Sequence, residues 1–111
     1  MSRALVFDQI AFEAACLHNA QIIDAVVAAY RADRWAREHA LSEAVASADV
    51  ERIKQSAHKL EGALGTLRAQ AAYEATGALL CAAESGRTET LVHLFERVRG
   101  ELLRLDQALS A

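Results

Sequence analysis

The apolar residues of this chain recur at steps of three and four, which is the spacing of one face of an α-helix. The clearest example follows Asp49, a residue type that favours the N-cap position of a helix. Its apolar positions form one continuous stripe: Val50, Ile53, Ala57, Leu60, Leu64 and Leu67. The pattern therefore predicts a helix over residues 50–67 with a single apolar face.

Two further segments with this spacing precede that helix. A short helix is expected to begin near Asp8, and a longer segment, residues 21–48, follows a predicted N-cap at Asn19. The apolar pattern of the longer segment weakens near Asp33. We therefore expect either one bent helix or two short ones there.

Two more helices are predicted after residue 67. An alanine-rich segment follows a turn at 68–70 and ends at Ser85 and Gly86, where glycine is typical of a left-handed helix stop. Thr88 is expected to cap the last helix, whose apolar face continues to Leu109. Short connections favour antiparallel neighbours. The predicted fold is all-α, an antiparallel up-and-down four-helix bundle with one or two additional short N-terminal helices.

The composition supports one helical domain over residues 1–111. The chain contains no proline and no low-complexity linker, and 53% of its residues are apolar but only 5% aromatic. A core of aliphatic side chains and alanine suits the packing of helix on helix. Cys16 and Cys81 both lie among apolar neighbours, so we interpret them as small core residues rather than as a disulfide or metal site.

Charge and hydropathy exclude some classes of function. The net charge is −3, and no basic stripe is present that would neutralise the phosphates of a nucleic acid. The apolar stretches are too short to cross a bilayer, and the N-terminus lacks the apolar region of a signal peptide. We expect a cytoplasmic protein that neither binds nucleic acid nor inserts into a membrane.

The predicted helix over residues 50–67 places His58 opposite its apolar stripe. At about 100° per residue, Lys54, Glu61, Gly62 and Gly65 all lie within roughly 60° of His58. Each glycine inside a helix costs about 1 kcal/mol relative to alanine. Bare backbone beside an exposed imidazole would let another protein or a phosphoryl group approach closely. Alternatively, the two glycines allow a neighbouring helix to pack tightly, and His58 is incidental.

The residues around His58 resemble a known motif. The histidine-containing phosphotransfer family has the pattern Ala-His-x-Leu-Lys-Gly, often with a further glycine three residues on. This chain has Ala57-His58-Lys59-Leu60-Glu61-Gly62 followed by Gly65. The resemblance covers nearly the whole chain, because the opening Phe7-Asp8 segment, the break at Ser85 and Gly86 and the final amphipathic helix occur in the family's order.

The resemblance implies a phosphorelay intermediate without kinase activity of its own. His58 would accept a phosphoryl group from an aspartyl phosphate on a receiver domain and pass it to another receiver, in a response regulator or a hybrid sensor kinase. The receiver would supply Mg²⁺, so we expect no metal site or cofactor in this chain. Gly62 and Gly65 would clear the docking surface. We expect a monomer, because a closed four-helix core needs no partner for stability.

One position departs from the family pattern. Glu61 stands where the family has lysine, and a carboxylate there is expected to repel a phosphohistidine by about 1 kcal/mol. On this basis Glu61→Lys would increase phosphoryl acceptance or phosphohistidine lifetime. The remaining residues assigned to the partner or phosphoryl surface are Lys54, Gln55, Lys59 and Arg68.

Two other functions are possible for the same residues. The chain could be an interaction module of a sensor kinase that docks a partner on the His58 face without phosphotransfer, which Glu61 would favour. Alternatively, His58 and Glu61, one helical turn apart, could form a general acid–base pair of an enzyme. That reading requires a concave site, and no nucleophile or cofactor motif accompanies the pair.

Overall fold

Short polar side chains begin the first three helices, as their place in the sequence predicts. In the computed structural model, which describes residues 4–110, the Asp8 carboxylate accepts a hydrogen bond from the backbone N–H of Ala11 and begins α1 (Gln9–Ala15). Asn19 likewise caps α2 (Ala20–Ser47), and Asp49 caps α3 (Val50–Leu67). Each cap satisfies backbone donors that a helix start otherwise leaves without a partner.

The second half of the chain contains α4 (Gln70–Glu84), a short 3₁₀ turn η1 (Thr88–Thr90) and α5 (Leu91–Ser110). Gly86 follows α4 with φ +73°, the left-handed conformation predicted for this stop. Thr88 does not cap α5 directly, because it begins the 3₁₀ turn that leads into that helix. The described residues thus form an all-helical protein, as predicted.

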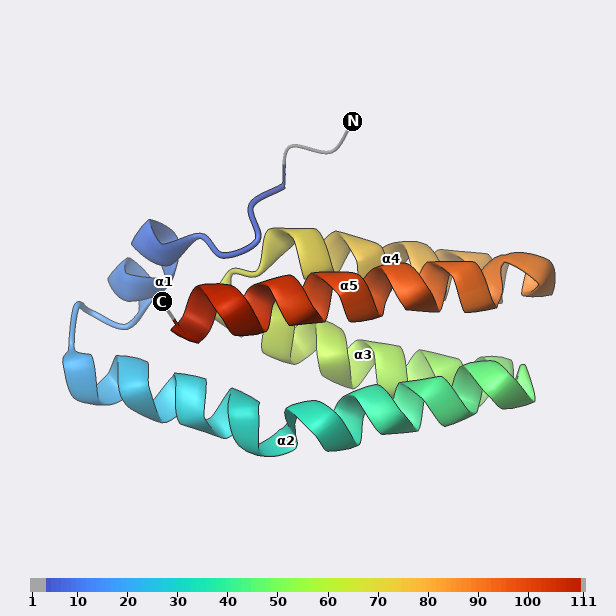
Figure 1. The fold of residues 1–111 in the computed structure, drawn as a ribbon, viewed down its shortest axis with the longest axis horizontal. Helices are drawn as coiled ribbons and strands as arrows, with labels where there is room; N and C mark the ends of the chain where they lie inside the picture. The colour runs from blue at the N-terminus through green and yellow to red at the C-terminus, as the bar shows by residue number, and fades with distance from the viewer. Residues whose placement is uncertain (1–3, 111) are drawn as a thin grey trace.

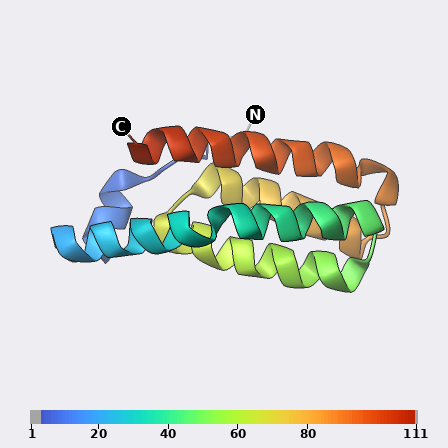
Figure 2. The same ribbon diagram turned by 60° about the horizontal axis from the view of Figure 1, so that its bottom comes forward.

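The long helices α2 to α5 lie side by side in Figure 1, each running opposite to the one before it, and α1 crosses them at one end. Helix α2 contacts α3, α3 contacts α4, α4 contacts α5, and α5 returns to α2. The turned view in Figure 2 shows the same arrangement. Each helix therefore has one side turned toward the other three and one side turned outward.

The core between these helices is aliphatic. The predicted stripe of α3 is completely buried at Ile53, Ala57, Leu60, Leu64 and Leu67, while Val50 at its start is half-buried. Small residues of α4 let its neighbours approach closely, and larger ones of α5 fill the space between them. The buried residues of these two helices are Ala72, Ala75, Thr76, Leu79, Leu80, Ala82, Ala83, Leu91, Phe95, Val98, Leu102 and Leu105.

The structure refines what the sequence predicts for α2 and corrects what it predicts for Cys81. Residues 20–47 form one continuous helix rather than two, so the weak pattern near Asp33 does not interrupt it. The outward side of this helix carries Trp35, which is 64% exposed. Both cysteines are free, but only Cys16 is a core residue, because Cys81 lies on the exposed side of α4.

The described residues contain no single helix that is long and apolar enough to cross a membrane. Within residues 4–110, α1 and α2 taken together have the length and apolar composition of a membrane span, but a bend of 113° separates them.

A buried arginine joins α2 to α5. The guanidinium Nε of Arg34 donates to both carboxylate oxygens of Asp106 at 3.0 and 3.2 Å, and its Nη1 donates to Glu38 at 2.8 Å. Burial alone would lower the pKa of Arg34, but the hydrogen bonds that Arg34 donates to Asp106 and Glu38, together with the negative charges of these two acids, outweigh burial and raise the pKa. The charged group is therefore tolerated between the helices because both acids compensate it.

We predict that Asp106→Ala destabilises the fold by about 2 kcal/mol, because it leaves the Arg34 charge partly uncompensated in the interior. Urea unfolding followed by circular dichroism measures the change. Asp33→Ala is the matched control, since Asp33 pairs with the partly exposed Arg37 in the same helix and such pairs contribute little. Equal losses in the two variants would contradict the assigned role of Asp106.

Tyr30 lies buried near this cluster. Among the described residues, nothing hydrogen-bonds its hydroxyl oxygen. Burial, and next to it the negative charge of Asp106, raises the pKa of Tyr30 from 10.0 to about 12. The folded protein thus resists ionisation of this phenol more than the unfolded chain does.

As a consequence, the stability contributed by neutral Tyr30 is complete below pH 10 and is lost as the pH rises toward 12. We predict that wild type loses about 2 to 3 kcal/mol more than Tyr30→Phe across this interval, measured by urea unfolding at each pH. Near neutral pH the two proteins should differ by no more than about 1 kcal/mol. Parallel pH profiles would show that Tyr30 titrates normally.

Candidate functional site

The imidazole of His58 projects from the outward side of α3. Its side chain is 63% exposed, whereas Ala57 and Leu60 on either side of it in the sequence are completely buried. The amphipathic pattern of α3 explains this placement, because burying the leucine stripe turns the opposite side of the helix to solvent. The imidazole ring is therefore accessible to solvent.

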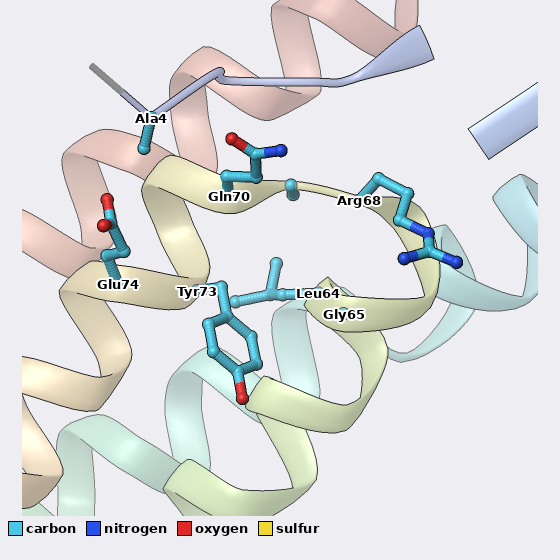
Figure 3. A pocket seen from close by; sticks show the side chains of 8 residues that line it. Ala4, Leu64, Gly65, Arg68, Gln70, Tyr73 and Glu74 are labelled. Carbon is cyan, nitrogen blue, oxygen red and sulfur yellow. The ribbon is translucent and has the colours of Figure 1, made fainter. Parts of the chain in front are cut away.

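The two glycines near His58 have different surroundings. A Cβ atom built on Gly62 would meet nothing within 4 Å, so the backbone one turn beyond the histidine is open. A Cβ on Gly65 would lie 3.7 Å from the ring of Tyr73, which projects from α4 across that turn of α3 (Figure 3). Both glycines are exposed, and a Cβ atom at Gly65 would make an ordinary van der Waals contact with Tyr73, whereas one at Gly62 would meet no neighbour.

Glu61 does not extend freely into solvent. Its side chain is only 16% exposed, and one carboxylate oxygen, Oε1, lies 3.3 Å from Nδ1 of His58. The other oxygen, Oε2, points toward α4, where a Cβ atom at Gly77 would lie 3.5 Å from it. The carboxylate thus occupies a position between the histidine ring and the backbone of the neighbouring helix.

A groove borders His58 on its other side, between α3 and α2. Its walls include His58, Lys59, Gly62 and Thr66 from α3 and Tyr30, Asp33 and Arg37 from α2. Arg37 donates a hydrogen bond from Nη1 to the backbone carbonyl of Lys59 at 3.1 Å and lies 3.4 Å from Asp33. Sequence spacing could not identify Arg37, Tyr73 or Gly77, because they lie on other helices and their register against α3 is set by packing.

Of the remaining residues predicted for this surface, three lie on the turns of α3 next to His58, and Arg68 lies away from it. Lys54 is half-buried, and its ammonium nitrogen is 3.8 Å from Glu51, so part of its charge is already compensated. Gln55 and Lys59 are exposed on adjoining turns. Arg68 is not near His58, because it ends α3 ten residues later, about 15 Å along the helix.

Arg68 belongs to a separate hollow, shown in Figure 3. This hollow lies where the chain before α1 passes over the turn between α3 and α4, and Gly65, Gln70 and Tyr73 also line it. The backbone of Arg68 is left-handed, with φ 61°, and its carbonyl accepts a hydrogen bond from the N–H of Asp8. The backbone of this residue therefore ties the N-terminal segment to the end of α3.

This arrangement offers an accessible imidazole with a carboxylate on its Nδ1 side and open backbone beside it. Within residues 4–110, no group of three or more histidine, cysteine, aspartate or glutamate side chains gathers to hold a metal ion. A general acid–base pair would need both side chains to face one concave site, but Glu61 is not part of the groove that His58 borders.

Searches for similar proteins identified no matching family model, curated protein or solved structure.

We predict that Gly62→Ala stabilises the protein by about 0.5 to 1 kcal/mol, because alanine favours the helix and its methyl group meets no other atom. If a partner approaches the backbone at this point, the same variant should bind or react with that partner at least tenfold more weakly. Gly100→Ala is the matched control, since Gly100 lies inside α5 and is equally open. It should stabilise the protein similarly and leave partner reactions unchanged, whereas equal partner effects would contradict a docking role for Gly62.

Proposed function

We propose that helices α2 to α5 form an up-and-down four-helix bundle of the histidine-containing phosphotransfer type and that the protein is a phosphorelay intermediate. His58 would accept a phosphoryl group from an aspartyl phosphate on a receiver domain and transfer it to a second receiver. The protein would act in the cytoplasm as a monomer and would have no kinase activity of its own. The motif around His58 and the order of the helices support this function.

The observation that carries the proposal is the exposure of the His58 imidazole beside the open backbone of Gly62. The accepting nitrogen must be exposed, so that an aspartyl phosphate on another protein can reach it. Helix α3 meets this condition because its opposite side is buried over its whole length. Neutral imidazole is a competent nucleophile near its ordinary pKa of about 6.5.

In this function the chain would mainly position the imidazole of His58, and the receiver would supply most of the groups that stabilise the transferring phosphoryl group. Phosphoryl transfer depends on in-line approach and on neutralising charge on the equatorial oxygens. We expect the receiver to supply Mg²⁺ for this purpose. Cationic groups near His58 that would meet an incoming phosphoryl group are Lys54, Lys59 and Arg37, the last from the neighbouring helix.

The direct test is incubation of the protein with phosphorylated receiver domains and Mg²⁺. We predict phosphate on His58 that is labile to acid and stable to base, and its reduction to background in His58→Gln. Acid and base treatment of the labelled protein, followed by peptide mapping, identifies the modified residue. An unlabelled wild type with several receivers, or a labelled His58→Gln protein, would refute the phosphorelay function.

A second function remains compatible with the same surface, a docking module that binds its partner without chemistry. The absence of the family's lysine at position 61 favours it, because that lysine would place a positive charge beside an incoming phosphoryl group. In that case His58→Ala would leave the dissociation constant of a bound receiver unchanged, and no phosphohistidine would form. Isothermal titration with the same receivers distinguishes the two functions.

A further inference from the structure

We propose that Glu61 is a positioning residue that holds the proton of His58 on Nδ1 and so presents Nε2 as the nitrogen that reacts. This inference rests on the proposed phosphotransfer at His58 and assigns a role to the one motif residue that departs from the family pattern. Sequence alone treats Glu61 as a charge that repels the phosphoryl group. Its place in the structure predicts that Glu61 increases the rate of phosphoryl acceptance at His58, which is the opposite of what repulsion would do.

The geometry places the carboxylate on one nitrogen only. Oε1 of Glu61 lies 3.3 Å from Nδ1 of His58 as an ion-pair contact, close enough for its negative charge to favour a proton on that nitrogen. A carboxylate accepts hydrogen bonds and does not donate them, so it favours the neutral tautomer with its proton on Nδ1. The lone pair of that tautomer is on Nε2, at the far side of the ring.

Helix α4 keeps the carboxylate in place. The other oxygen of Glu61 lies where α4 has Gly77, and a side chain at this position would reach within 3.5 Å of it. Because the Glu61 side chain is only 16% exposed, it has less freedom to leave the ring than a carboxylate on the open surface. An interaction with a preorganised group costs less entropy when the reaction begins.

The same contact favours the reaction itself. The lone pair of Nε2 forms the N–P bond while the P–O bond to the donor aspartate breaks, and the aspartate carboxylate leaves with the bonding electrons. The proton on Nδ1 remains, so the phosphorylated ring gains a positive charge. A carboxylate beside that proton stabilises the charge. Return of the phosphoryl group to a receiver restores the neutral ring.

The first experiment measures the tautomer without any receiver. Two-bond ¹H–¹⁵N NMR spectra of the ring nitrogens, recorded above the pH at which His58 becomes neutral, distinguish protonated Nδ1 from protonated Nε2. We predict predominantly Nδ1–H in wild type and in Glu61→Gln, whose amide oxygen can still accept the proton. Glu61→Ala should shift the population toward Nε2–H. A wild-type ring protonated mainly on Nε2 overturns the inference.

The second experiment measures reactivity. Phosphoramidate is a small phosphoryl donor, and ³¹P NMR shows which ring nitrogen carries the product. We predict phosphorylation on Nε2 in wild type and Glu61→Gln, and an acceptance rate about fivefold lower in Glu61→Ala, the factor expected from one ordinary hydrogen bond. Glu61→Lys should be at least as slow, because an ammonium group cannot accept the Nδ1 proton. Faster acceptance in Glu61→Lys overturns the inference and supports simple repulsion.

Glu101→Ala is the matched control. Glu101 lies on α5 with a side chain 15% exposed, and it pairs with Arg104 one helical turn on at 3.1 Å. The variant removes one carboxylate of similar burial far from the histidine, and it should leave the tautomer and the rate unchanged.

The two experiments also separate this inference from the proposed function. A wild type that takes no phosphate from any receiver refutes the relay, while the NMR spectra still decide the role of Glu61.

Discussion

The burial of one side of α3 is the constraint on which the rest of the structure depends. Five of its residues, spaced at steps of three and four, are completely buried, and α3 packs against α2 and α4. A helix that buries such a stripe has no freedom to rotate about its axis, because rotation would expose leucine and bury charge. The direction of His58 is therefore a consequence of core packing and requires no support from its own contacts.

Neighbouring helices then decide what surrounds that histidine. Helix α4 places a glycine where the Glu61 carboxylate needs space and a tyrosine where Gly65 would otherwise be open. Helix α2 brings Arg37 and the groove on the opposite side. The buried pair of Arg34 with Asp106 fastens α2 to α5. The site is thus built on α3 but is completed by two helices that contribute no residue to the motif.

Glu61 illustrates how the burial of a charged side chain changes which of its interactions are strongest. On an open helix face, a carboxylate one turn from a phosphohistidine acts mainly through screened repulsion. Held between the ring and α4, the same carboxylate contacts Nδ1 and lies on the opposite side of the ring from Nε2. The positioning of the Nδ1 proton that we propose for Glu61 is such a local effect, and it opposes the longer-range repulsion of the phosphoryl group.

Local pattern by itself determined the all-helical class, the caps at Asp8, Asn19 and Asp49, the stop at Gly86 and the outward direction of His58. These features depend on residues within a few positions of one another. Only the tertiary structure decided that α2 is continuous, that Cys81 is exposed, that Gly65 lies under Tyr73 and that Glu61 turns toward Nδ1. The surroundings of Cys81, of Gly65 and of the Glu61 carboxylate depend on the register of one helix against another, which is set by the packing of whole side chains and not by spacing along the chain.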